Sequence, residues 1–377
     1  MCETTIDQSL AGHFSSLEDP RCPINRRHLL GELIFIVIAA TLCGADTWVA
    51  IAAFARAKED WLRKFLTLPH GIPSHDTFGR VFGLLDVDKF EACFRSWSHS
   101  LCNLIAGEII AIDGKTLRRS HDRCHGLPAL HLVSAWATEN RVVLGQVATD
   151  AKSNEITAIP KLLECLNLEG STVTIDAMGC QTKIVEKIVD KGGNYVLSLK
   201  GNQGTLATEV AKAFDAACAQ NYAGVDSDFF ETVDHDHGRI ETRRYWTLGD
   251  LSDIPRSELW KGMNAVGMVE SQREVAGNVS TETRYYIMST GTSAEYFAQA
   301  TRGHWGIENE LHWNLDVSFR EDESRIRDIN ARQNLAAIRR ITLIHLKKDN
   351  TKLGIWNKRL QAGWNTDYLE DLLFPSK

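Results

Sequence analysis

Residues 108–199 alternate short apolar runs with segments of helical spacing, and this order constrains the fold more than any other feature of the chain. Five apolar runs are typical of strands: 108–113, 130–136, 142–148, 171–176 and 195–199. Two segments with apolar residues at helical spacing, 156–166 and 182–189, separate the last three runs. Parallel strands need crossover helices, and these two segments can supply them. We therefore expect three antiparallel strands continued by two parallel ones, which is the order of the RNase H-like fold.

The regions on either side of this order divide the chain into further parts. Apolar spacing predicts helices at 29–43, 47–65, 74–82, 87–104 and 329–347. Strand-like runs at 239–248, 265–269 and 284–289 predict a mostly β segment. Thr292, followed by Glu295, has the spacing of a capping box and predicts a helix to about Leu311. We expect an α/β chain with these parts: an all-α N-terminal domain (1–104), an RNase H-like core (105–204 and 291–350), a mostly β insertion (205–290) and a lightly structured tail (351–377).

Charge and cysteine content exclude some classes of protein. The formal net charge of -7 argues against a protein that coats nucleic acid by bulk charge, although a local basic groove stays possible. The nine cysteines form no Cys-x-x-Cys pair, so reduced thiols are expected rather than a zinc ribbon or a disulfide framework. The N-terminus lacks the basic segment of a signal peptide, and the most apolar stretch, 33–45, is shorter than the roughly 20 residues of a spanning helix. We expect a cytoplasmic protein without a membrane segment.

Two of the predicted strands end in a carboxylate. Asp113 and Asp176 each close an apolar run, and the expected strand order can place the two strands side by side. Neighbouring carboxylates repel unless a cation lies between them, and Mg²⁺ prefers such hard oxygen ligands. One interpretation is a metal site that activates an attacking oxygen and stabilises a leaving one. The other is that each aspartate caps a turn, which is the commoner role for either residue taken alone.

A third carboxylate has to come from the helix that begins near Thr292. Glu308 is the candidate, because it lies four residues after His304 and shares a helix face with it. Glu310 should point away, about 200° further round the helix, and is the alternative. Asp316 is expected beyond the end of the helix. A lone glutamate on a helix is otherwise most often a solvated charge.

Four longer motifs contain or adjoin these residues. They are Asp113-Gly114-Lys115-Thr116, Asp176-Ala177-Met178-Gly179-Cys180-Gln181, Leu199-Lys200-Gly201-Asn202-Gln203 and the segment from His304 to Trp313. They resemble the motifs of the bacterial ISAs-type insertion-sequence transposases, the group that includes the H-repeat-associated proteins. The resemblance covers about residues 15–350.

The resemblance implies a DDE transposase, which cleaves DNA and joins the freed ends to a target. Asp113, Asp176 and Glu308 would then be the catalytic and metal-binding triad, with two Mg²⁺ or Mn²⁺ ions. It implies double-stranded DNA as the partner, a homodimer on paired element ends, and no small-molecule cofactor. The accessory Tyr-Arg-Glu-Lys signature of wider relatives is not kept, because Thr301, His304 and Leu315 stand at the Tyr, Arg and Lys positions.

Polar residues near the predicted strand ends are expected to contact DNA. They are Lys115, Arg118, Arg119, Lys200, Gln203 and His304. Arginine suits phosphate because its planar fork binds two oxygens at once. The alternatives are a solvated loop after the first strand and, after the fifth, a loop stabilised by Asn202. His235 and His237 are expected in an exposed loop of the insertion.

The helix at 74–82 could be the second half of a helix-turn-helix, but it has no clear basic face, and a structural role is favoured. Two other functions stay open for the chain as a whole. One is a hydrolytic nuclease with the same core but no joining step, and the other is a catalytically inactive, DNA-binding transposase remnant. A glycosidase also uses paired carboxylates, but the basic loops and the lack of an aromatic sugar platform disfavour it.

Overall fold

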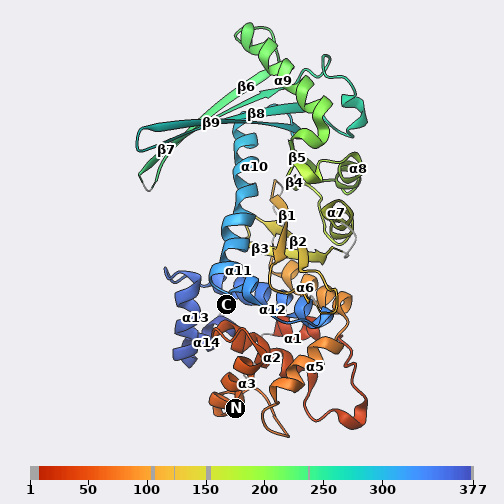
Figure 1. Ribbon diagram of the computed structural model, residues 1–377, viewed down its shortest axis with the longest axis vertical. Helices are drawn as coiled ribbons and strands as arrows, with labels where there is room; N and C mark the ends of the chain where they lie inside the picture. Colours follow the sequence, from red (N-terminus) through yellow and green to blue (C-terminus); the bar gives the residue numbers. More distant parts are fainter. Residues whose placement is uncertain (1–7, 103–106, 123, 150–153, 237, 375–377) are drawn as a thin grey trace.

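A mixed sheet of nine strands forms the centre of the computed structural model, which describes residues 8–102, 107–122, 124–149, 154–236 and 238–374 (Figure 1). The strand order is β3-β2-β1-β4-β5-β9-β8-β7-β6. The strands are β1 (Ile109–Leu117), β2 (Leu130–Ala137), β3 (Val142–Ala148), β4 (Thr172–Ile175), β5 (Asn194–Leu199), β6 (Ser227–Asp236), β7 (Arg239–Leu248), β8 (Ala265–Val275) and β9 (Asn278–Met288).

The first five strands form the predicted core. β1 pairs antiparallel with β2 and parallel with β4, β2 pairs antiparallel with β3, and β4 pairs parallel with β5. The crossover helices α7 (Glu155–Glu164) and α8 (Thr182–Asp190) pack on one face of the sheet, where Ile110 and Ile112 of β1 are fully buried against them. The expected fold class is confirmed.

The insertion continues the sheet of the core. After helix α9 (Gly204–Ala219), strands β6 to β9 form an antiparallel meander, and its last strand pairs with β5. The distal ends of these strands project beyond helix α10 (Ala294–Gly306), which follows them in the chain (Figure 1). The sequence did not predict β6, which carries polar residues on both faces. His235 therefore lies in a strand rather than in the expected loop, and His237 lies outside the described residues.

The N-terminal region is helical, as expected. Its α-helices are α1 (Gln8–Phe14), α2 (Leu30–Leu42), α3 (Trp48–Ala57), α4 (Glu59–Leu62), α5 (His75–Leu84) and α6 (Val87–Ser100). The helix expected at 47–65 breaks at Lys58 into α3 and α4. Ser74 caps α5 as predicted, because its hydroxyl accepts a hydrogen bond from the Thr77 amide.

The C-terminal helices complete the core of this helical region. The long helix α12 (Ile329–Lys348) is buried on nearly all sides, and one apolar cluster joins it to α2, α3, α5 and α6. The expectation of a lightly structured tail is wrong, because α13 (Ile355–Trp364) and α14 (Thr366–Leu373) pack into the same cluster. Leu369 is fully buried there, and the buried Arg359 donates to the Thr41 carbonyl and to Asp46.

The eight cysteines of the described part are free thiols. In the same part of the chain, no helix is long and apolar enough to cross a membrane.

Candidate active site

Asp113 and Asp176 lie side by side on neighbouring strands. Ile112 of β1 pairs with Ile175 of β4, so the two aspartates are the next residues along parallel strands. Asp176 directly follows β4, as predicted. Asp113 does not end its strand, because β1 continues for four more residues and keeps its pairing with β2 as far as Leu117.

Hydrogen bonds in the turns after β4 and β5 fix the Asp176 carboxylate and the loop that follows it. Its Oδ1 accepts hydrogen bonds from the amides of Met178, at 2.9 Å, and Gly179, at 3.4 Å. From the turn after β5, Asn202 donates to the carbonyl of Ala177 and Gln203 donates to that of Cys180. This is the loop-stabilising alternative considered for this segment, and it uses the Gln203 amide that was predicted to contact DNA.

Glu308 comes from a long, irregular helical segment. The helix α10 (Ala294–Gly306) continues as a π-helical turn (Ile307–His312) and then as α11 (Trp313–Val317). Its cap is Ser293, whose side chain accepts from the Tyr296 amide, and not Thr292 as the capping-box spacing suggested. The segment also runs further than expected, so that Asp316 lies inside α11 rather than beyond the helix.

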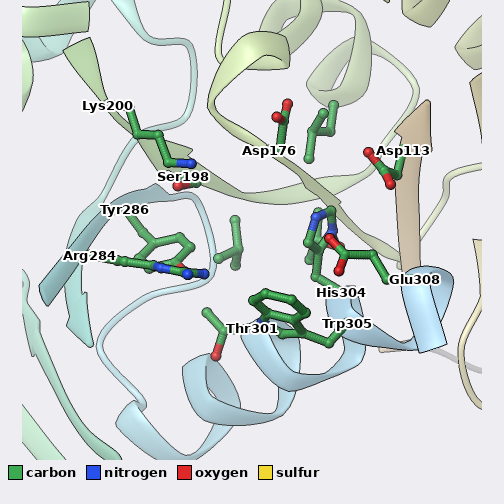
Figure 2. Close-up of a pocket in the computed structure, with 13 residues that line it drawn as sticks. Asp113, Asp176, Ser198, Lys200, Arg284, Tyr286, Thr301, His304, Trp305 and Glu308 are labelled. Carbon is green, nitrogen blue, oxygen red and sulfur yellow. Dashed lines mark hydrogen bonds between the residues drawn. The ribbon is translucent and has the colours of Figure 1, made fainter. Parts of the chain in front are cut away.

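Glu308 and its alternative, Glu310, have different surroundings in the structure. Glu308 projects into the same pocket as the two aspartates (Figure 2). Glu310 instead lies 3.0 Å from Lys347 Nζ and 3.6 Å from Arg141 Nε. Glu310 is therefore a partner for two cations outside this pocket.

The pocket has a volume of about 180 Å³ and contains both signs of charge. Its lining residues are Asp113, Thr174, Ile175, Asp176, Val196, Ser198, Lys200, Arg284, Tyr286, Thr301, His304, Trp305 and Glu308. Asp113 and Glu308 lie at one side of it, Lys200 and Arg284 at the other, and Asp176 between them (Figure 2). Such a pocket can hold a group with anionic oxygens against the cations, and its carboxylates offer the oxygen ligands that a divalent metal ion prefers.

The carboxylates differ in acidity because their neighbours differ. Burial raises the pKa of Asp113, but His312, whose Nδ1 lies 3.3 Å from Asp113 Oδ2, together with His304 and the Gly114 amide, leaves that pKa below its usual value. Burial, followed by the negative charge of Asp113, raises the pKa of Glu308. Burial lowers the pKa of His304 although Asp113 and Asp176 oppose the shift, and its Nδ1 lies 3.1 Å from the Thr174 hydroxyl.

Comparisons with known proteins identify the family. The family described as "Transposase DDE domain" matches residues 106–344, and the one described as "DDE_Tnp_1-associated" matches residues 11–98. The chain is 42% identical to "Putative transposase YncI" of Escherichia coli O157:H7, over 97% of this chain and 94% of the relative. It is 37% identical to "H repeat-associated putative transposase YhhI" of Escherichia coli K12, over 98% of both chains. The chain belongs to the DDE transposase family.

A solved structure of another transposase overlaps only loosely with this chain. The cryo-EM structure of the piggyBac transposase synaptic complex with hairpin DNA covers 98% of this chain and 77% of its own, with a TM-score of 0.43 and 8% identity.

The three carboxylates of the pocket are ligands of the type that binds divalent cations. All three offer hard oxygen ligands, and the charges of Asp113 and Asp176 both contribute to the raised pKa of Glu308, after burial. A cation among them would relieve this repulsion. Within the described residues, no three His, Cys, Asp or Glu side chains already stand in a metal-holding arrangement. The fit therefore lies in the ligand type, because carboxylate oxygens are the donors that Mg²⁺ prefers.

The structure places the basic residues that were predicted to contact DNA in three different settings. Lys200 and His304 line the pocket. Arg118 and Arg119 are exposed in the loop after β1 and do not line it. Lys115 is buried, and its Nζ lies 2.5 Å from Asp316 and 3.0 Å from Asp322. Because these ion pairs occupy its ammonium group, the location of Lys115 does not support a DNA contact.

Sequence reasoning assigned no role to three residues of the site. His312 contacts Asp113, and Arg284 and Tyr286 of β9 line the pocket. His304, Glu308 and His312 lie four residues apart from one another, and this spacing could have predicted that His312 shares a helix face with Glu308. No local signal marked Arg284 or Tyr286, because they reach the site only through the pairing of β9 with β5.

Proposed function

We propose that this chain is an active DDE-type transposase, which cleaves DNA at the ends of an insertion sequence and joins the freed 3′ ends to target DNA. The observation that carries the proposal is the single pocket lined by Asp113, Asp176 and Glu308. Membership in the transposase family supports the reaction class. Both steps are phosphoryl transfers, so the protein's main tasks are alignment and charge neutralisation.

Asp113, Asp176 and Glu308 hold two Mg²⁺ or Mn²⁺ ions in this proposal. When bound, these ions supply activation of the attacking oxygen and stabilisation of the leaving oxygen. The unequal acidity of the carboxylates matters here, because Glu308 has to lose its proton before it can serve as a ligand.

Lys200 and Arg284 bind the non-bridging oxygens of the scissile phosphate in this proposal. Arg284 is held in place for that task by a two-point contact with Glu282, at 2.9 and 3.0 Å, and its guanidinium lies 5.3 Å from the centre of the Trp305 ring. His304 stays neutral because burial lowers its pKa, so it offers a hydrogen bond rather than a charge. The DNA is double-stranded, and two copies of the chain bring two element ends together.

Removal of each carboxylate tests the proposal. Asp113→Asn, Asp176→Asn and Glu308→Gln should each abolish Mg²⁺-dependent cleavage of a labelled duplex that carries an element end. Glu310→Gln is the matched control, since it lies two residues from Glu308 but outside the pocket, and it should cleave like the wild type. Wild-type rates in any of the three variants would remove that residue from the proposed triad.

A strand-transfer assay with precut ends separates this proposal from its rivals. Joined products support transposition. Cleavage without joined products would indicate a hydrolytic nuclease, and DNA binding without any metal-dependent turnover would indicate an inactive remnant.

A further inference from the structure

A second, larger pocket lies between the N-terminal helices and the segment that follows α11. It has a volume of about 780 Å³ and is lined by the first turns of α3 and α5, by Arg320 and residues 323–326, and by Arg339 of α12. None of the three carboxylates of the candidate active site lines it. The proposed chemistry therefore leaves this pocket without a role.

Two helices begin at this pocket. Thr47 caps α3 by accepting from the Ala50 amide at 3.2 Å, and Ser74 caps α5 by accepting from the Thr77 amide at 3.3 Å. Each helix has ten residues, so each directs a developed dipole with its positive end toward the pocket. Amides and dipoles at helix N-termini favour anions such as phosphate.

A buried arginine with unmet hydrogen-bond donors also lines the pocket. Arg339 is only 1% exposed, and its Nη1 lies 3.6 Å from Glu321. Its Nε and Nη2 have no hydrogen-bond partner among the described residues. Buried donors without partners are costly, and an anion in the pocket would stabilise this guanidinium.

Arg80 and Arg325 add two exposed cations to the pocket wall. Within the part of the chain that the structure describes, neither residue forms an ion pair. Arginine is the side chain best shaped to bind phosphate oxygens in pairs.

Most of the pocket's carboxylates already have cationic partners. Asp46 is bound by Arg359 at 2.5 Å, and Glu323 is bound by Arg320. Asp76 is highly exposed and lies 3.4 Å from His75. The free charge at the pocket therefore comes mainly from arginine.

The same segment connects this pocket to the catalytic strand. Asp322 accepts from Lys115 of β1 at 3.0 Å and lies 3.2 Å from Arg118 Nε, while the Arg119 amide donates to its carbonyl. Arg118 and Arg119, directly after β1, are exposed. In Figure 1, α11 and α12 lie between β1 and the N-terminal helices.

We infer that the pocket binds a backbone phosphate of duplex DNA between the first turns of α3 and α5 and the guanidinium groups of Arg80, Arg325 and Arg339. The helical region thereby holds the DNA that leads away from the active site. This assignment rests on the proposed function, because it concerns the same substrate. A phosphate contact positions DNA without reading its sequence, which suits a helix α5 that has no basic face to place in a groove.

The double variant Arg80→Gln/Arg325→Gln tests the inference. DNA binding is measured by fluorescence anisotropy without divalent metal, at several salt concentrations, on a duplex with an element end and on an unrelated duplex. The plot of log affinity against log salt should become less steep by about 1 for each phosphate that the variant no longer binds, and affinity should fall by a similar factor for both duplexes. Arg56→Gln is the matched control, because Arg56 is exposed at the opposite end of α3, and it should bind like the wild type.

Methylphosphonate substitution locates the contact on the DNA. A neutral linkage at the bound position should weaken binding by the wild type but not by the double variant. If the double variant keeps the wild-type salt slope, or if Arg56→Gln weakens binding as much, this inference is overturned while the proposed function stands. If the wild type binds neither duplex, both fall. If inorganic phosphate alone raises the melting temperature through Arg80 and Arg325 while the salt slope stays unchanged, the pocket takes a free anion and the assignment to DNA is overturned.

Discussion

Replacement of Glu321 by Gln should destabilise the fold by roughly 3–5 kcal/mol, the usual cost of leaving a buried ion without its partner. Glu321 is fully buried, and its Oε1 lies 3.0 Å from Arg340 Nη1 and 3.6 Å from Arg339 Nη1. Both guanidinium groups are buried as well, at 0% and 1% exposure. The variant would leave two buried cations without a counter-charge, at the point where the segment after α11 meets α12.

The effect should depend on pH with a defined sign. Burial would raise the pKa of Glu321, but Arg340 and Arg339 outweigh burial and lower it from its usual value. The stabilisation by Glu321 is therefore fully present above the unfolded-state pKa of about 4.3, and it is lost as pH falls through the lower folded-state pKa. For a chain of 377 residues that unfolds in one transition, 3–5 kcal/mol corresponds to a fall in melting temperature of about 4–6 °C.

Urea unfolding near neutral pH and again in acid would measure this difference. Glu323→Gln is the control, because Glu323 lies two residues away in an exposed pair with Arg320, and it should change stability little. A decrease of less than about 1 kcal/mol in the free energy of unfolding of Glu321→Gln near neutral pH would show that Glu321 is not required to stabilise the buried arginines. An equal loss in acid would contradict the assigned pKa direction.

Two further substitutions test a close contact and a pKa direction. Gly114→Ala should lower the free energy of unfolding, measured in urea, by about 1–3 kcal/mol, because a Cβ there would lie 2.1 Å from Glu155 Oε1 and 2.6 Å from His131 Nε2. Gly201→Ala is the control, since a Cβ at Gly201 would have nothing within 4 Å. Equal losses in the two variants would contradict the predicted clash. Glu308→Gln should be more stable than the wild type at neutral pH without metal. The reason is that a raised pKa makes the ionised carboxyl unfavourable in the fold, and the gain should disappear below the unfolded-state pKa of about 4.3. A gain that is the same at both pH values would refute this reading.

The core of the fold could be predicted because its strands are short, apolar and bounded by clear breaks. The run that ends at Asp176 is such a strand, and the two crossover helices then require parallel neighbours. The end of β1 was misplaced because Gly114 and Lys115 look like a break. In the structure, the charge of Lys115 is satisfied by Asp316 and Asp322, which no local pattern indicates.

The helices of the tail were missed for a related reason. They are short and rich in polar residues, and their helical state depends on packing against α2 and α12 rather than on intrinsic preference. Strand β6 was missed because it is an edge strand whose paired backbone, rather than apolar alternation, defines it.

Only part of the candidate site could be predicted from the sequence pattern. Asp113 and Asp176 followed from strand order, whereas Glu308 depended on a family resemblance and on a helix whose π-helical turn has no recognised sequence signal. The structure favours Glu308 over Glu310 as the third carboxylate, because Glu308 lines the pocket and Glu310 is paired with Lys347 and Arg141.

The pairing of β9 with β5 has a consequence for how relatives of this chain can diversify. The last strand of the insertion is hydrogen-bonded to the core and carries Arg284 and Tyr286 into the wall of the candidate active site. The insertion therefore cannot be exchanged freely between relatives. The insertion of a relative would have to pair with the edge of β5 and also place suitable side chains in the pocket wall. We expect insertions and deletions to cost least at the distal ends of the hairpins, where the strands pair only with one another.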